Sequence, residues 1–306
     1  MTLFYRRMPR FDYVRPASVA EALAALSPDE PVRNQVFSGG TDLMPKLKSR
    51  AIKAPPRVID LKGIAGLAYI DFKPGEGLRL GANTTIREVA QSSSVLTHYP
   101  ALATGAGLIA SNQLQHRGTI VGNICNAVPS ADSAPPLLAH DAQVVCVSGD
   151  GERIVSIADF FVAPGVTALA PGEIVKEIRL PPPPSGERSV YLKLVSRGRM
   201  DLAVVGVAVM AVVSGGVFQQ VRIGLGSAAP IPVRATQAEM ALKGQRVSAE
   251  IIAQAATIAA ANTTTRSSHR ASAEYRREMI EVLVRRALTQ VTQNTPLAVL
   301  NHQGKP

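Results

Sequence analysis

The sequence predicts an α+β protein of two domains, because short strands alternate with capped helices before a proline-rich boundary and long strands follow it. Its 306 residues suit one large domain or two ordinary ones. The boundary is the run Pro181–Gly186, PPPPSG, since four consecutive prolines join neither a β-ladder nor a helix interior. Apolar residues make up 46% of the chain, which is ample for a core.

Before the boundary, strands and helices are short. Two capping boxes, Ser18-x-x-Glu21 and Thr85-x-x-Glu88, predict helix starts, and the first helix is expected to run through Leu26. Small apolar residues predict a buried helix over Pro100–Ala110 and a helical turn over Pro136–His140. Strands are expected at Phe11–Val14, Val36–Phe37, Val58–Leu61, Leu78–Ala82 and Ile174–Leu180, with a hairpin formed by Ala142–Val147 and Arg153–Ile157.

After the boundary the apolar runs lengthen. A strand is expected at Val190–Val195, and Leu202–Val213 and Val217–Leu225 read as two long strands joined by a glycine turn. An Ala/Ile-rich stretch, Ile251–Ala261, predicts a helix. A second helix is predicted where Tyr275, Met279, Val282 and Leu283 share one face, and residues beyond Thr292 read as a loose polar tail.

The most informative stretch is Gly118–Pro135, GTIVGNICNAVPSADSAP, whose only charged residue is Asp132. It is not a helix by pattern. Gly and Asn accept left-handed backbone angles, so such a chain can turn repeatedly and point several N–H groups at one place. A concavity of that kind binds anions, usually phosphate. The alternative is a buried loop that only connects two strands.

A second glycine turn lies in Val36–Pro45, VFSGGTDLMP. Gly39 and Gly40 lack side chains, so backbone can approach a ligand, and Thr41 and Asp42 supply a hydroxyl and a carboxylate. The turn matches neither a P-loop nor a dinucleotide fingerprint. Two anion-friendly turns suit a pyrophosphate better than a single phosphate does.

Composition argues against several classes of protein. The net charge of +10 would suit nucleic acid, but aromatic residues are only 4% and no base-stacking motif occurs, so a solvated or docking face is the better interpretation. Two cysteines, Cys125 and Cys146, cannot build a four-cysteine zinc site, an iron–sulfur cluster or a disulfide framework, which fits a reducing compartment. We expect no metal site and no signal peptide. We also expect no membrane insertion, because the longest apolar run, Leu202–Val213, is too short to span a bilayer.

Five ordered motifs carry a family resemblance that covers nearly the whole chain. They are VFSGGTDLMPKLK, Ile109–Pro135, Gly172–Pro181, Tyr191–Val204 with Lys193, Arg197 and Asp201, and ASAEYRREMIEVLVRRAL. Together they resemble the FAD-binding medium subunit of the molybdenum hydroxylases, the xanthine dehydrogenase and carbon monoxide dehydrogenase family.

The resemblance implies a two-lobed FAD-binding domain of the vanillyl-alcohol-oxidase (PCMH) type and a smaller α/β domain. The domains are expected at 1–180, with lobes of about 1–55 and 56–180, and at 187–292, before a tail at 293–306. The partners implied are a large molybdopterin subunit, which oxidises the substrate, and a small [2Fe–2S] subunit, in a cytoplasmic dimer of heterotrimers. The medium subunit takes electrons onto FAD and passes them to an external acceptor.

The resemblance also implies cofactor contacts and no catalytic residue on this chain. The first pyrophosphate loop is similar to Ser38–Leu43 and the second to Thr119–Asn123. The predicted FAD-binding residues are Ser38, Gly39, Gly40, Thr41, Asp42, Leu43, Ile109, Ala110, Thr119, Gly122, Asn123, Asp132, Ile174, Val175, Tyr191 and Lys193. Of these, Asp132 is expected at the adenosine half, Ile174 and Val175 at the adenine, and Ile109, Ala110, Tyr191 and Lys193 at the isoalloxazine ring.

The sequence departs from the family pattern at Val121, where relatives usually carry the first Gly of TIGGN. A branched side chain is tolerable there if the residue keeps a negative φ. Gln115 and His116 also stand where Arg and Asn are common. With two cysteines, the chain cannot carry the extra [4Fe–4S] cluster of some relatives. The competing hypotheses are a stand-alone flavin oxidase or dehydrogenase, and a nucleotide-binding module without redox function.

Overall fold

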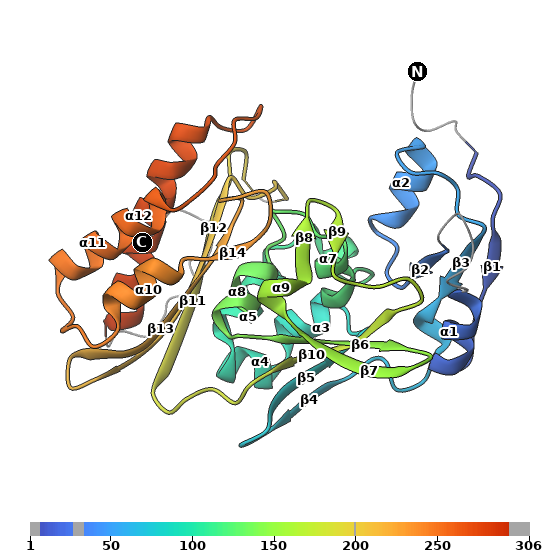
Figure 1. The fold of residues 1–306 in the computed structure, drawn as a ribbon, viewed down its shortest axis with the longest axis horizontal. Coiled ribbons are helices and arrows are strands. Elements are labelled where there is room, and N and C mark those ends of the chain that lie inside the picture. The colour runs from blue at the N-terminus through green and yellow to red at the C-terminus, as the bar shows by residue number, and fades with distance from the viewer. Residues whose placement is uncertain (1–6, 27–33, 199, 294–306) are drawn as a thin grey trace.

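The computed structural model describes residues 7–26, 34–198 and 200–293, in three regions placed side by side in Figure 1. The first region is a parallel sheet of order β1-β3-β2, formed by Asp12–Val14, Arg57–Asp60 and Gln35–Phe37. Helix α1 (Val19–Leu26), helix α2 (Leu43–Ser49) and the 3₁₀ turn η2 (Leu61–Gly63) accompany it. The central strand β3 lies beyond the division expected near residue 55, so it belongs with the first lobe.

The middle region is an antiparallel sheet of order β4-β5-β10-β6-β7. Its strands are β4 (Ile70–Lys73), β5 (Gly77–Gly81), β10 (Ile174–Leu180), β6 (Gln143–Ser148) and β7 (Gly151–Ser156). The helices of this region are α3 (Ile86–Gln91), α4 (Ser93–His98), α5 (Pro100–Gly107), α6 (Asn112–Gln115), α7 (Ile120–Cys125), α8 (Ala134–Ala139) and α9 (Ile157–Phe160). A small hairpin of β8 (Phe161–Ala163) and β9 (Val166–Thr167) completes it.

The C-terminal region is an antiparallel sheet of order β11-β12-β13-β14. Its strands are β11 (Glu187–Leu194), β12 (Val205–Ser214), β13 (Val217–Gly226) and β14 (Val233–Arg234), and its helices are α10 (Thr236–Leu242), α11 (Ala249–Ala261) and α12 (Ala273–Thr292). The helices cover one face, while Ala208 and Met210 of β12 pack with Ala101 of α5 and Ala139 of α8. Both faces of β12 are therefore buried, which explains its unbroken apolar sequence.

Most elements predicted from patterns are present. Thr85 and Glu88 form the expected reciprocal capping box of α3, and α1 ends at Leu26 as predicted. Two expectations are corrected. The stretch Gly118–Pro135 contains helix α7, and the long strand begins at Val205 rather than Leu202. Of the tail expected at 293–306, only Gln293, the C-cap of α12, belongs to the described residues.

Candidate functional site

A cavity of about 860 Å³ opens where the three regions meet, and it collects residues that are far apart in the sequence. Its walls come from the first glycine turn with α2, from Ile109, Ala110 and α7, and from the segment 165–175. The loop after β11 contributes Met200, Asp201 and Leu202. Every predicted FAD-binding residue except Tyr191 lines this one cavity.

The first turn is shaped by two glycines with different physical roles. Gly39 packs so closely on the second glycine segment that an added Cβ would lie 2.1 Å from the Arg117 carbonyl oxygen. Gly40 has φ +71°, and its Cβ would lie 2.2 Å from the Phe37 ring. Because Gly39 has no side chain, the two turns can pack directly against each other. From the sequence, Gly39 was expected only to open space for a ligand.

The second turn continues into α7 rather than remaining a loop. Thr119 caps this helix, and its Oγ1 accepts a hydrogen bond from the Gly122 backbone N–H at 2.9 Å. Val121 lies inside α7, where φ is negative, and its side chain is buried. The replacement of the usual glycine is thus absorbed by helical backbone. Asn123 accepts a hydrogen bond from Ser133 Oγ at 2.6 Å, which ties α7 to the segment before α8.

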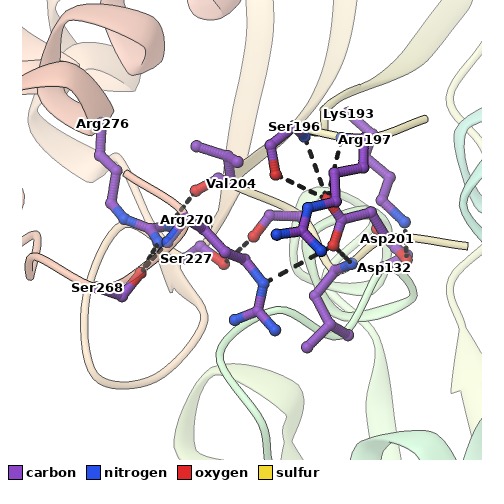
Figure 2. Close-up of polar contacts among 12 residues, drawn as sticks. Asp132, Lys193, Ser196, Arg197, Asp201, Val204, Ser227, Ser268, Arg270 and Arg276 are labelled. Atoms are coloured by element: carbon purple, nitrogen blue, oxygen red, sulfur yellow. Dashed lines mark hydrogen bonds and ion pairs between the residues drawn. The ribbon is translucent and has the colours of Figure 1, made fainter. Parts of the chain in front are cut away.

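A buried ion pair lies at one end of the cavity. Lys193 Nζ is 2.8 Å from Asp132 Oδ2 and donates a further bond to the Leu108 carbonyl oxygen at 3.2 Å. The Tyr191 hydroxyl donates to Asp132 Oδ1 at 2.7 Å. Figure 2 shows the Lys193 and Asp132 side chains directed toward one another. The carboxylate thus has partners on both oxygens while it still lines the cavity.

The surroundings of Asp132 act on the ionisation of its carboxyl in two opposite directions. Burial raises the pKa of the Asp132 carboxyl, while the charge and hydrogen bonds of Lys193 and the hydroxyl of Tyr191 act in the opposite direction. The pKa of Tyr191 is raised well above its ordinary value, first by burial and then by the neighbouring carboxylate. Tyr191 therefore stays a neutral donor to Asp132.

The ion pair bears on two expectations about position. Tyr191 is buried behind Asp132, holds its carboxylate by a hydrogen bond and does not line the cavity. Asp132 and Lys193 were expected at opposite halves of an extended cofactor, yet they are in direct contact. Lys193 is also bonded to Leu108, which directly precedes the cavity residue Ile109, so the pair lies beside Ile109 in the cavity wall.

The loop between β11 and β12 is held by Asp201. Asp201 Oδ2 accepts bonds from the Ser196 hydroxyl at 2.8 Å and from the Arg197 backbone N–H at 3.2 Å (Figure 2). Arg270 Nε lies 3.8 Å from its other oxygen. Hydrogen bonds from Ser196 and the loop backbone keep the pKa of Asp201 below its ordinary value despite some desolvation.

Several cavity residues were not predicted from the sequence. Lys46 and Asn126 both line the cavity, and the Lys46 ammonium donates a hydrogen bond to the Asn126 side-chain oxygen. Lys46 follows directly after the first glycine turn, inside VFSGGTDLMPKLK, so proximity to that motif was the available signal. No local pattern marked the hairpin residue Val166 or the loop residue Met200.

Comparison with known proteins places both parts of the chain. Residues 9–183 match the FAD binding domain in molybdopterin dehydrogenase, and residues 190–291 match the CO dehydrogenase flavoprotein C-terminal domain. The chain is 31% identical to the xanthine dehydrogenase FAD-binding subunit of Escherichia coli, over 91% of this chain and 94% of that protein. It is 34% identical to the carbon monoxide dehydrogenase medium chain of Afipia carboxidovorans, over 91% and 95%.

Solved structures agree in fold. A chain of carbon monoxide dehydrogenase from Hydrogenophaga pseudoflava superposes with a TM-score of 0.88 at 35% identity, covering 92% of this chain and 97% of that one. A chain of quinoline 2-oxidoreductase from Pseudomonas putida gives 0.86 at 26% identity, covering 94% and 98%. The protein therefore belongs to the FAD-binding medium subunits of the xanthine dehydrogenase and carbon monoxide dehydrogenase family, and it is an FAD-dependent oxidoreductase subunit.

Proposed function

We propose that the chain is the electron-transfer subunit of a heteromeric molybdenum hydroxylase, taking electrons from a [2Fe–2S] partner onto FAD and passing them to an external acceptor. The observation that carries the proposal is the single cavity that unites both glycine turns with the Asp132–Lys193 pair. The proposed domain limits follow the sheets. The first lobe extends through β3, and the C-terminal domain begins at β11.

The residues present fit FAD. The cavity volume of about 860 Å³ is within the usual range of roughly 300–1,000 Å³ for cofactor sites. The turns Ser38–Leu43 and Thr119–Asn123 would hold the pyrophosphate, and Ile174 with Val175 the adenine. Because Asp132 contacts Lys193, both would lie at the ring, beside Ile109 and Ala110.

FAD, when bound, supplies the redox chemistry, and the chain supplies orientation and charge. Lys193 would place a cation at the ring end of the cavity, where Asp132 fixes its position and Tyr191 fixes that of Asp132. At that end the cavity is lined by the apolar side chains of Ile109 and Ala110, which would exclude water from the bound ring.

A partner protein is supported by the surface around the cavity. Leu114, Val166, Met200 and Leu202 line it and remain 40–61% exposed, which is typical of a surface that another protein covers. Two carbon monoxide dehydrogenase relatives are named medium chains, which supports a complex with large and small subunits. We extend this to a dimer of heterotrimers in the cytoplasm, where free thiols such as Cys125 and Cys146 persist.

The stand-alone oxidase has less support. Such an enzyme needs an acid or base over the flavin, commonly His or Tyr. Among the described residues that line the cavity there is neither a histidine nor a tyrosine, and the acidic Asp132 is engaged by Lys193.

Purification of the isolated chain tests the proposal. It should contain noncovalent FAD that denaturation releases, and it should not oxidise purines, aldehydes or carbon monoxide. Co-expression with a molybdopterin chain and a [2Fe–2S] chain should restore substrate oxidation. Oxidation of substrate by the isolated chain, free of molybdenum and iron, would instead support the stand-alone enzyme.

A matched pair of glycine variants tests the pyrophosphate assignment. Gly40→Val should abolish FAD binding, because it adds a branched side chain at φ +71° against Phe37. Gly149→Ala, in a hairpin turn with nothing within 4 Å of the added Cβ, should bind FAD normally. Equal FAD occupancy in the two purified variants would remove the first turn from the proposed site.

A further inference from the structure

Lys46 is a cavity lysine whose described hydrogen bond goes to a neutral group. It lies on α2, one turn beyond the first glycine turn, and its Nζ donates to Asn126 Oδ1. Asn126 is the C-cap of α7, the helix that begins at the second turn. The contact therefore bridges the first lobe and the middle region, next to both turns. Each of the two side chains is partly buried and lines the cavity.

The other buried charges of the cavity are already compensated. Lys193 is paired with Asp132, and Glu173 accepts two bonds from Arg153. Asp42 lies one helical turn before Lys46, but no ion pair joins them within the part of the chain that the structure describes. A neutral amide oxygen does not compensate an ammonium, so Lys46 brings uncompensated positive charge to the cavity wall.

The position of this charge beside the two turns indicates which group of FAD it would bind. FAD offers one strongly anionic group, its pyrophosphate, and the two turns proposed to hold that group begin the helices that carry Lys46 and Asn126. The ring end of the cavity, marked by Lys193 and Leu108, has its own ion pair. We propose that the Lys46 ammonium binds the FAD pyrophosphate directly, and that Asn126 positions it for this contact.

This role adds a cationic side chain to a site whose other predicted contacts are backbone groups, hydroxyl groups and the Asp42 carboxylate. A lysine ammonium has three donors, so it can keep the bond to Asn126 and still donate to a phosphate oxygen. Charge-assisted bonds of this kind are shorter and stronger than neutral ones. Lys46 and Asn126 come from different regions, so their hydrogen bond holds those regions together beside the cofactor. Bound FAD and this hydrogen bond would therefore stabilise each other.

The test is FAD binding to the apo form of the full chain, followed by flavin fluorescence at low and high salt. Lys46→Met should raise the Kd about 10- to 100-fold, the range expected for losing a hydrogen bond to a charged group. The difference from wild type should shrink in 1 M salt, where the screening length falls to about 3 Å. Lys48→Met is the matched control, since Lys48 lies on the same helix but does not line the cavity. It should stay within about twofold of wild type, the spread expected for a surface change.

Two further variants separate binding from bridging. Lys46→Arg keeps the charge and should retain most of the affinity. Asn126→Ala removes the bridge but keeps the ammonium, so it should cost less affinity than Lys46→Met. The proposal is overturned if Lys46→Met binds FAD like Lys48→Met. It is also overturned if Lys46→Met and Asn126→Ala lose the same affinity without salt dependence, because Lys46 would then only join the two regions.

Discussion

Two buried carboxylates in this protein have similar partners and different surroundings. Asp132 accepts bonds from Tyr191 and Lys193, and it lines the cavity. Glu177 lies in the middle of the second sheet, on β10, and does not line the cavity. Its side chain is fully buried and also accepts from a tyrosine, together with two arginines. Those partners are Tyr69, Arg79 at 3.0 Å and Arg179 at 2.6 Å.

The difference between them lies in how the charges are compensated. Glu177 has two guanidinium partners, which reach partly into solvent at 42% and 36% side-chain exposure. Burial alone would raise its pKa, but hydrogen bonds from Tyr69, Arg179 and Arg79 outweigh burial and lower it. Asp132 has a single cationic partner, Lys193, which is itself buried. The pKa of the Asp132 carboxyl is raised, chiefly by burial. A buried ion pair by itself is thus no sign of function, and the position of Asp132 in the cavity wall is what connects it to the cofactor.

Removing the carboxylate at the cavity should have the largest effect. Asp132→Ala leaves the buried Lys193 ammonium without a counter-ion, and breaking a buried pair in this way typically costs about 3–5 kcal/mol of unfolding free energy. FAD affinity should fall as well, since Lys193 loses its position. Denaturant unfolding and FAD titration measure the two effects. If FAD affinity is unchanged in folded Asp132→Ala protein, the pair does not face the cofactor.

Glu177→Gln should be less destabilising than Asp132→Ala. It should cost about 1–3 kcal/mol of unfolding free energy, because Arg79 and Arg179 can rehydrate. FAD affinity should not change. The folded pKa of Glu177 is lowered, so its contribution is fully present above about pH 4.3, where an unfolded glutamate is ionised. The stability difference between wild type and variant should therefore shrink as pH falls through the folded pKa. A loss of FAD affinity would contradict the separation of the two clusters.

The smallest effects are expected from a matched pair of tyrosine variants. Tyr191→Phe and Tyr69→Phe each remove one hydroxyl donor to a buried carboxylate, which should cost about 1 kcal/mol of stability in both cases. Only Tyr191→Phe should change FAD affinity or the flavin absorbance bands, because only its carboxylate lines the cavity. Identical flavin spectra and affinities in the two variants would show that Tyr191 does not act through Asp132 on the cofactor.

Local sequence was sufficient where structure depends on neighbours in the chain. The capping box at Thr85, the helix ending at Leu26 and the proline-rich boundary are set by caps, backbone restrictions and apolar periodicity within a few residues. The ordered motifs also predicted the family, and every residue they indicated for FAD except Tyr191 lines the one cavity. Even so, Thr119 was missed as a helix cap, because the glycines and asparagines after it read as a turn.

The sequence by itself determined the two-domain α+β architecture, the family and the FAD cofactor, because each rests on short motifs in a fixed order. Only the tertiary structure decided what those motifs do to each other. Lys193 and Asp132 are 61 residues apart, and Lys46 and Asn126 are 80 apart. Gly39 meets the Arg117 backbone across a similar distance along the chain. No local pattern encodes such contacts, since they form only when separate sheets and helices pack together and bring their side chains to one cavity.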